Sequence, residues 1–227
     1  MVKRMSAVLT LAMLSAAGPA IAADGSRSVV VTSSNALDNQ LLVFDPTGGL
    51  IQSVPTLGQG GAGGNAGGVA AKNGLVAVVN SGSQTVSVFA RALSGFELRS
   101  LVATSSQPVS VAFGKDHLYV LGTTTVESHR VVGEEVEPAA DGVVTLLAAD
   151  GSAAQVGVAG DELIATEKSG TIERIRLSGG AVAGTPRPVD APASITQTPF
   201  GFVTRGSTAY VTNAGSDLVA VVKNGTV

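Results

Sequence analysis

The chain has 227 residues, of which 44% are hydrophobic, and it contains no cysteine and no tryptophan. This composition is typical of a protein with a hydrophobic core rather than a disordered one. The lack of cysteine excludes disulfides, thiol catalysis and cysteine-ligated zinc or iron–sulfur centres. The formal net charge is −3 and no basic patch stands out, which argues against a nucleic-acid partner.

Residues 1–22 have the pattern of a secretory signal peptide. Lys3 and Arg4 precede an apolar stretch at Ala7–Ala17, and Ala20-Ile21-Ala22 is an A-x-A cleavage site. The alternative is a buried N-terminal helix or an uncleaved anchor. We expect a mature chain that begins at Ala23 in the periplasm or outside the cell, with 12 basic residues against 17 acidic ones. No later segment is long and apolar enough to predict a membrane-spanning helix.

Five later segments share one design: a short apolar strand, a polar turn and a second β-branched strand. The five segments are residues 29–44, 76–89, 118–131, 163–175 and 209–222. The residue that closes the first strand of each pair recurs at spacings of 47, 42, 45 and 46, at Ser33, Asn80, Gly122, Glu167 and Asn213. A repeat period in the forties that contains only strand signals is typical of β-propeller blades.

Each unit also has room for two further strands. A strand of small residues precedes the pair in four units, at residues 67–74, 108–116, 155–162 and 200–207. A weaker fourth strand follows it, as at Phe96–Ala103, and residues 133–142 of the third unit read as a longer exposed loop. We therefore predict that residues 23–227 form a single all-β propeller domain of four-stranded blades, with five repeats visible.

The two ends of the array are unequal. The first unit begins at its second strand, Val29–Thr32, and the chain ends at Val227 soon after the fifth pair. A closed propeller usually fills such a gap from the other end of the chain, so that no edge stays unpaired. Two alternatives remain: a five-bladed ring that closes imperfectly, or the front part of a longer propeller. The pattern favours the second and predicts self-association through open edges.

Several stretches carry a family likeness. They are "YVTN" at Tyr210–Asn213, "GGAGGNA" at Gly60–Ala66, "VVNSGSQTVSVF", "QPVSVAFGKDHLYVLG", "TEKSGTI" and "TPFGFV". The first resembles the YVTN-type β-propeller repeat. The others, which run along the chain in the expected order, resemble the lactonase-like seven-bladed β-propellers, especially the secreted members of that group. The resemblance implies a seven-bladed ring, of which this chain shows five blades. That family includes proteins named as lactonases and carboxymuconate-cyclase-like proteins.

In a propeller, the loops entering the innermost strands and the loops between the second and third strands share one face, around the mouth of the central channel. We call it the mouth face. We expect it to gather Asn65, Asn80, Gln107, Glu167, Lys168, Thr198 and Asn213. Asn65, Asn80 and Asn213 are candidate ligand-binding residues. For Asn80 and Asn213 the alternative is a turn-forming role, which their recurrence favours.

Charged candidates are few. Glu167 is a candidate general base, and Lys168 beside it could hold a lactone or a carboxylate; the alternative is a solvated pair at a strand end. Arg130 is a candidate carboxylate clamp, with His129 next to it as a possible acid or base. His117, in a turn on the opposite face, is expected at the surface.

No metal or cofactor is predicted. The two histidines lack zinc-ligand spacing, and no D-x-D-x-D loop is present. The Gly-rich stretch Gly58–Gly68 lacks the Lys-Ser/Thr ending of a phosphate loop, and no G-x-S-x-G element occurs.

Two functional hypotheses follow. The first is an exported propeller that binds a small molecule or a partner protein. The alternative is a lactone hydrolase or cycloisomerase, with Glu167 as base and Lys168 or Arg130 orienting an anionic substrate. The two blades that are missing from a seven-bladed ring favour the first.

Overall fold

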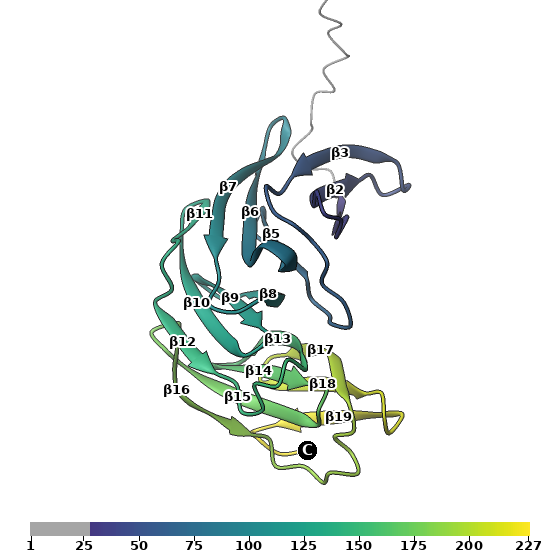
Figure 1. The fold of residues 1–227 in the computed structure, drawn as a ribbon, viewed down its shortest axis with the longest axis vertical. Coiled ribbons are helices and arrows are strands. Elements are labelled where there is room, and N and C mark those ends of the chain that lie inside the picture. The colour runs from purple at the N-terminus through teal and green to yellow at the C-terminus, as the bar shows by residue number, and fades with distance from the viewer. Residues whose placement is uncertain (1–27) are drawn as a thin grey trace, which may run out of the picture.

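The computed structural model describes residues 28–227, so the predicted signal peptide at residues 1–22 lies outside the described residues. In the described part, the strands form five antiparallel sheets in chain order, one for each sequence repeat. The sheets are the blades of an all-β propeller arranged in an open arc (Figure 1). This confirms the predicted fold class.

The blades follow the strand order that the repeat predicts. Blade 1 contains β1 (Val30–Ser33), β2 (Gln40–Phe44) and β3 (Leu50–Pro55). Blade 2 contains β4 (Val69–Lys72), β5 (Leu75–Asn80), β6 (Thr85–Ala92) and β7 (Gly95–Ala103), with the short 3-10 helix η1 (Ser81–Ser83) between β5 and β6. Blade 3 contains β8 (Pro108–Phe113), β9 (His117–Gly122), β10 (Thr125–Val132), β11 (Glu135–Val136) and β12 (Gly142–Thr145). Blade 4 contains β13 (Ala153–Ala159), β14 (Glu162–Glu167), β15 (Thr171–Ser178) and β16 (Ala181–Pro188). Blade 5 contains β17 (Pro199–Arg205), β18 (Thr208–Asn213) and β19 (Leu218–Lys223).

Burial along the strands reflects how many neighbours each blade has. Every residue of β5, in blade 2, is buried, because blades 1 and 3 cover both faces of that sheet. In β18, at the end of the array, buried and exposed residues alternate, because blade 4 covers one face alone. This alternation is the period-2 pattern of a half-buried strand.

The core lies between consecutive blades, in four clusters of mainly Val, Leu, Ile and Ala side chains. The first strands of blades 2 to 5 contact one another in sequence, so they line the inner side of the arc. The small residues of β4 and β13 suit this crowded position, where a larger side chain would separate the blades.

Blade 3 departs from the prediction of a long exposed loop at residues 133–142. This stretch contains β11, and Val136 is buried against blade 2, with its backbone N–H donating to Ser100 Oγ at 2.9 Å. β11 and β12 both pair with β10, one with each half of that strand. The fourth strand of this blade is therefore split in two by an exposed turn, and the prediction was wrong in part.

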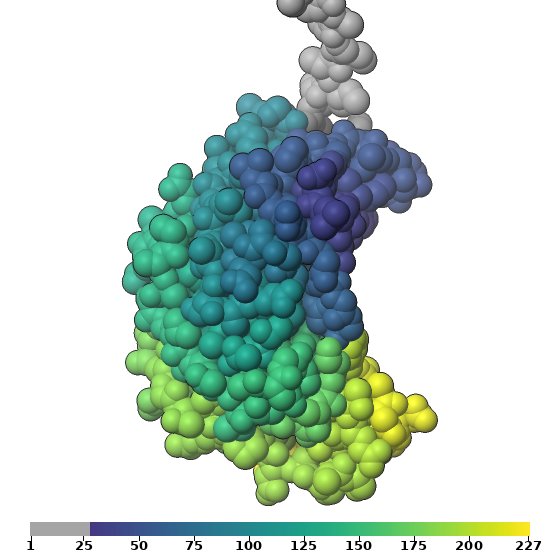
Figure 2. All heavy atoms as spheres, viewed as in Figure 1, coloured from purple at the N-terminus to yellow at the C-terminus, as the bar shows by residue number. Residues whose placement is uncertain are grey.

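Over the described residues, the blades at the two ends of the arc, 1 and 5, have three strands each, and Figure 2 shows the hollowed side between them. Within residues 28–227, no helix has the length and apolar character that a membrane crossing requires.

Candidate functional site

A Gly-rich loop, residues 58–68, runs along the inner side of the arc from blade 1 to blade 2 (Figure 1). Asn35 holds its first half: Oδ1 accepts hydrogen bonds from the N–H groups of Gly61 and Ala62 at 2.8 and 3.0 Å, and Nδ2 donates to the Ala62 carbonyl at 2.8 Å. Gly60 packs directly on the backbone of Asn35, where a Cβ would lie 2.3 Å from the carbonyl carbon. Glycine is therefore required at position 60.

The far half of the loop reaches blades 3 and 4. Lys168 Nζ donates to the Gly64 carbonyl at 2.6 Å, the Asn65 side chain donates to the Val109 carbonyl, and the Ala66 N–H donates to the Ala154 carbonyl at 3.0 Å. The loop thus ties blade 1 to blades 3 and 4 across the mouth face. Two sequence-predicted ligand residues, Asn65 and Lys168, are brought together here, and both hydrogen-bond within the protein.

Asn80 lies at the end of the second strand of blade 2 and is fully buried. Its Oδ1 accepts from Asn39 Nδ2 at 2.8 Å, and its Nδ2 donates to Ser87 Oγ at 2.7 Å. Asn39 belongs to blade 1, so this amide pair joins the two blades. Asn39 was not singled out from the sequence, although its place before a strand in a polar turn is where side-chain-to-backbone bonding is common.

Glu167 takes the same repeat position in blade 4 and is also fully buried. Its two carboxylate oxygens accept hydrogen bonds from the backbone N–H groups of Ala148 and Ala149, each at 3.1 Å. Glu173, on the adjacent strand β15, accepts from the Leu147 N–H at 3.1 Å. Two carboxyl groups therefore hold three consecutive amides of the loop that enters blade 4.

The Glu173 carboxyl group has a strongly perturbed pKa. Burial and the nearby Glu167 carboxylate raise the pKa of Glu173 to about 8. A buried carboxyl beside a second carboxylate favours its protonated form at neutral pH. A raised pKa is what a general acid needs, but both side chains are shut off from solvent in this structure.

Asn213 occupies the corresponding position in blade 5. Its Nδ2 donates to the Val211 carbonyl at 3.1 Å, and its Oδ1 is buried without a hydrogen-bond partner. Asn80, Glu167 and Asn213 each lie in a separate blade, at the end of its second strand. The structure does not bring these three candidates to one site.

Arg130 lies away from the mouth face. It is exposed near the end of β10, where it pairs with His117 at the start of β9. The mouth-face residues follow the other ends of the second strands, so Arg130 and Glu167 do not form one site. His129, next to Arg130, is buried with Nε2 3.3 Å from Glu127 Oε1.

Glu127 was not predicted from the sequence as a site residue. Burial opposes its charge, but hydrogen bonds from His129 and Ser105 outweigh this effect and hold the pKa of Glu127 below its usual value. Glu127 corresponds to Glu173 and Ser87 in the repeat, and all three bond to the loop that enters their blade. These three residues occupy the same position in the third strand of their blades. This shared position is the sequence signal that could have pointed to Glu127.

The expected surface position of His117 was wrong. The ring is buried, with Nδ1 2.8 Å from Asp116 Oδ1 and Nε2 2.7 Å from Asp141 Oδ2. Tyr119 stacks against it, and Gly180 of blade 4 packs on its edge. The turn sequence is polar, but packing of blade 4 against blade 3 covers the ring.

Two hollows open on the mouth face. The larger has a volume of about 630 Å³ and is lined by the turns of blades 1 and 2, with Leu37, Leu57, Asp38 and Gln59 among its residues. Leu37 is 80% exposed and Leu57 is 68% exposed. A smaller hollow of about 280 Å³ lies between Ser33, Asn35 and Asn65, beside the Gly-rich loop.

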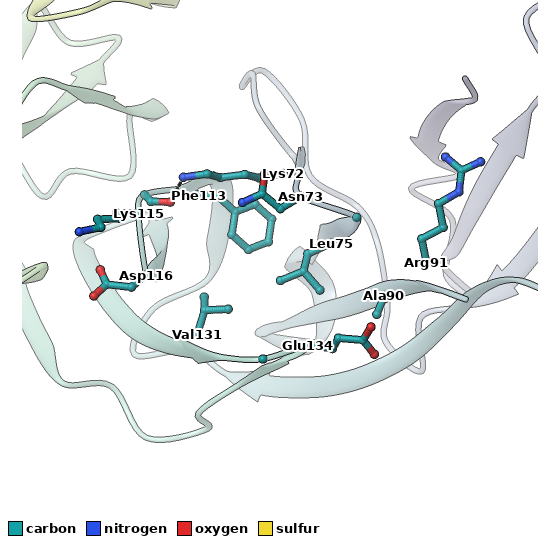
Figure 3. Close-up of a pocket in the computed structure, with 13 residues that line it drawn as sticks. Lys72, Asn73, Leu75, Ala90, Arg91, Phe113, Lys115, Asp116, Val131 and Glu134 are labelled. Atoms are coloured by element: carbon teal, nitrogen blue, oxygen red, sulfur yellow. Dashed lines mark hydrogen bonds between the residues drawn. The ribbon is translucent and has the colours of Figure 1, made fainter. Parts of the chain in front are cut away.

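A third hollow, of about 270 Å³, lies on the opposite face between blades 2 and 3 (Figure 3). Leu75, Phe113 and Val131 form its apolar floor, while Lys115 and Asp116 stand at its rim. Lys72 closes one side by donating to the Gly114 carbonyl.

Among the described residues, no group of three or more His, Cys, Asp or Glu side chains could hold a metal ion.

Comparisons with known proteins bear on the fold. No protein-family model and no curated protein sequence matches the chain. Among solved structures, the periplasmic gluconolactonase of Pseudomonas aeruginosa aligns with a TM-score of 0.60 and 14% identity, over 88% of this chain and 63% of its own. A Bacteroides uniformis protein assigned as a 6-phosphogluconolactonase aligns with a TM-score of 0.60 and 17% identity, over 85% of this chain and 63% of its own.

Propellers of other kinds align as well. BamB from Moraxella catarrhalis matches with a TM-score of 0.55 and 10% identity, over 86% of this chain and 54% of its own. The chain thus spans less than two thirds of the lactonase chains that it matches. At these identities the likeness establishes the fold: the chain has a β-propeller fold like that of the gluconolactonases.

Proposed function

We propose that the protein is an exported, lactonase-like β-propeller of the YVTN-repeat type that binds a small molecule or a segment of a partner protein on its mouth face. The observation that carries the proposal is the hollow of about 630 Å³ between the turns of blades 1 and 2. Its volume falls in the range of small-molecule sites, and it combines exposed leucines with a few polar groups, as such sites do.

The backbone of the hollow supports this proposal. Leu57 has a φ of 60°, in the left-handed region that leucine rarely adopts, and its side chain is held in solvent. A non-glycine residue in this region costs on the order of 1–3 kcal/mol and persists where the surrounding structure imposes it. An apolar side chain displayed at such a cost is consistent with a contact to a ligand.

The candidate catalytic groups support binding rather than turnover. Both Glu167 oxygens accept backbone N–H bonds, and Lys168 is bonded to the Gly-rich loop. A general base must reach the proton that it removes, and Glu167 is buried under Ala148 and Ala149. The alternative, a lactone hydrolase or cycloisomerase, is favoured by the gluconolactonases among the structural neighbours.

An assay with aliphatic and aromatic lactones separates the two functions. The mature protein, Glu167→Gln and a control, Glu97→Gln at an exposed position of β7, are tested for hydrolysis. The binding proposal expects no turnover in any of them. Turnover in the mature protein that is lost in Glu167→Gln and kept in Glu97→Gln would establish the enzyme alternative.

A second measurement tests the hollow itself. Saturation-transfer NMR with the same lactones and their hydroxy acids is recorded on the mature protein, Leu57→Asp and Leu93→Asp. Leu93 is 84% exposed in blade 2 and does not line the hollow. We expect signals that Leu57→Asp abolishes and Leu93→Asp leaves; equal signals in all three proteins would place binding elsewhere.

A further inference from the structure

Three arginines surround a cavity of about 300 Å³ on blade 4. The cavity is lined by Arg174 and Arg176 of β15, Arg187, Gly184 and Thr185 of β16, and Glu162 of β14. We call it the arginine pocket. A net of two positive charges is concentrated here, in a protein whose formal net charge is −3.

The strand register forces the arginines together. Arg174 on β15 lies directly opposite Arg187 on β16, so both side chains project from the same face of the sheet. Arg176 also projects from this face, because it is two residues further along the same strand. Like charges directly opposite one another on adjacent strands are destabilising, and the one acidic residue that lines the pocket leaves them partly uncompensated.

A bulge opens the space between the two strands. The pairing shifts between Arg174 and Arg176, where β15 has one intervening residue and β16 has three. Gly184, within the bulge, has a φ of 75°, and a Cβ there would lie 3.4 Å from Arg176 Nη2. The irregularity widens the sheet at the point where the three cations meet.

Arg174 is fixed at the back of the pocket. Its Nη1 lies 3.3 Å from Glu162 Oε2, and Gly225 of blade 5 packs on its guanidinium. Its Nε is buried without a hydrogen-bond partner. Arg176 and Arg187 are exposed, and within the described residues neither forms an ion pair with an acidic side chain. One cation is therefore preorganised, while two remain available to a ligand.

We infer that the arginine pocket binds a small dianion that carries a phosphate group. Guanidinium groups present their donors in a planar fork that matches phosphate oxygens, and a dianion neutralises the net charge of the pocket. The Thr185 hydroxyl supplies a further donor. Since a liquid water molecule takes about 30 Å³, the cavity has room for roughly ten non-hydrogen atoms. Inorganic phosphate and a small organic phosphate both fit this description.

Calorimetric titration with inorganic phosphate, at constant ionic strength, tests the inference on the mature protein. Arg176→Gln and Arg187→Gln remove exposed cations of the pocket, and Arg99→Gln makes the same charge change in blade 2, outside it. We expect binding of one phosphate, weakened about tenfold or more in each pocket variant and unchanged in Arg99→Gln. Failure of the mature protein to bind millimolar phosphate, or equal weakening in Arg99→Gln, would overturn the inference.

Two further titrants identify the ligand. Glycerol phosphate binding more tightly than inorganic phosphate supports an organic phosphate, and equal affinity supports free phosphate. Succinate binding more tightly than both overturns the assignment to phosphate. Circular dichroism of each variant confirms that folding is retained, so that a lost affinity reports on the pocket.

Discussion

The last residue of the second strand has one recurring task in this protein. Asn80, Gly122 and Glu167 each meet the loop that arrives from the preceding blade: Asn80 packs against Gly58, Glu167 bonds to two amides, and Gly122 leaves space for Ser106. Different residues thus accommodate the same feature, a connection packed between blades, and Glu167 also satisfies two of its backbone N–H groups. Recurrence of the position, rather than of the residue, marks the structural role.

Asn80 and Asn213 form a matched pair for testing this role. Asn80→Ala removes three side-chain hydrogen bonds and leaves one N–H of the buried Asn39 amide without its acceptor, so we expect the free energy of unfolding to fall by about 2 kcal/mol. Asn213→Ala removes one bond and also removes an unpartnered Oδ1, so a loss of about 1 kcal/mol or less is expected. Urea unfolding of both variants checks the order; a larger loss in Asn213→Ala would contradict it.

Glu173 makes the free energy of unfolding depend on pH, and its raised pKa determines the sign of that dependence. Because its pKa rises from 4.5 to about 8 on folding, the folded chain keeps a proton that the unfolded chain releases. This group therefore lowers the free energy of unfolding as the pH rises from about 4.5 to about 8. Above about pH 8 this decrease in the free energy of unfolding is complete, and below about pH 4.5 there is no decrease.

Glu173→Gln keeps an oxygen acceptor for the Leu147 N–H and cannot ionise. At pH 9 we expect it to be more stable than the wild type by about 2 kcal/mol or more, whereas at pH 5 the two should be close. Glu97→Gln, at an exposed position, serves as control. Urea unfolding at both pH values checks this prediction, and a wild-type pH slope in Glu173→Gln would refute it.

Among the elements, the Gly-rich loop has no counterpart in the other blades. Its length lets it cross the mouth face and bond to blades 1, 3 and 4, so it links parts of the array that are not adjacent in sequence. Its glycines differ in what they do. Gly60 is buried against the Asn35 backbone, whereas a Cβ at Gly63 would meet nothing within 4 Å.

Alanine at these two glycines separates packing from loop entropy. Gly60→Ala would place a Cβ against a backbone carbonyl, so a loss of about 1–3 kcal/mol in the free energy of unfolding is expected. Gly63→Ala has room and no positive φ, so we expect a neutral effect or a gain of up to about 1 kcal/mol. Thermal and urea unfolding compare the two; similar losses in both variants would show that the crossing is not as described.

The elements could be predicted from the sequence because their signals are local. The repeat period and the β-branched runs placed the five strand pairs, and small residues before them located the first strands, such as β8 and β13. β11 was missed, because a two-residue strand depends on contact with blade 2 and has no pattern of its own.

The candidate site was less predictable. The sequence identified Asn65 and Lys168 as mouth-face residues, but it could not show that Lys168 would donate to the Gly-rich loop or that Asn65 of that loop would donate to blade 3. It placed Arg130 with Glu167, although strand register puts them at opposite ends of their blades. Register and blade-to-blade packing are set by contacts over forty or more residues, so no single stretch of sequence contains them.

At the scale of the whole molecule, the described arc ends in two half-covered blades. On blade 5, Val203, Tyr210 and Val221 are cross-strand neighbours on the face away from blade 4, and they are 69%, 38% and 48% exposed. On blade 1, Val30 and Leu50 lie in one row with Phe44, on the face away from blade 2. Apolar faces of this kind normally pack against a neighbouring blade.

These end faces predict concentration-dependent self-association of the purified chain. Burying one such side chain contributes about 1.5–3 kcal/mol, so pairing the row on blade 5 with the row on blade 1 of a second copy would be favourable. Such a contact joins unlike surfaces and does not close on itself, so it would produce a series of oligomers rather than one dimer.

Val221→Lys places a charge on the blade 5 row and should shift the distribution of oligomers toward monomer. Leu93→Lys, on an exposed turn of blade 2, should not. Sedimentation velocity across a wide range of concentration distinguishes these outcomes, and a monomer at every concentration in the unmodified protein would contradict the prediction.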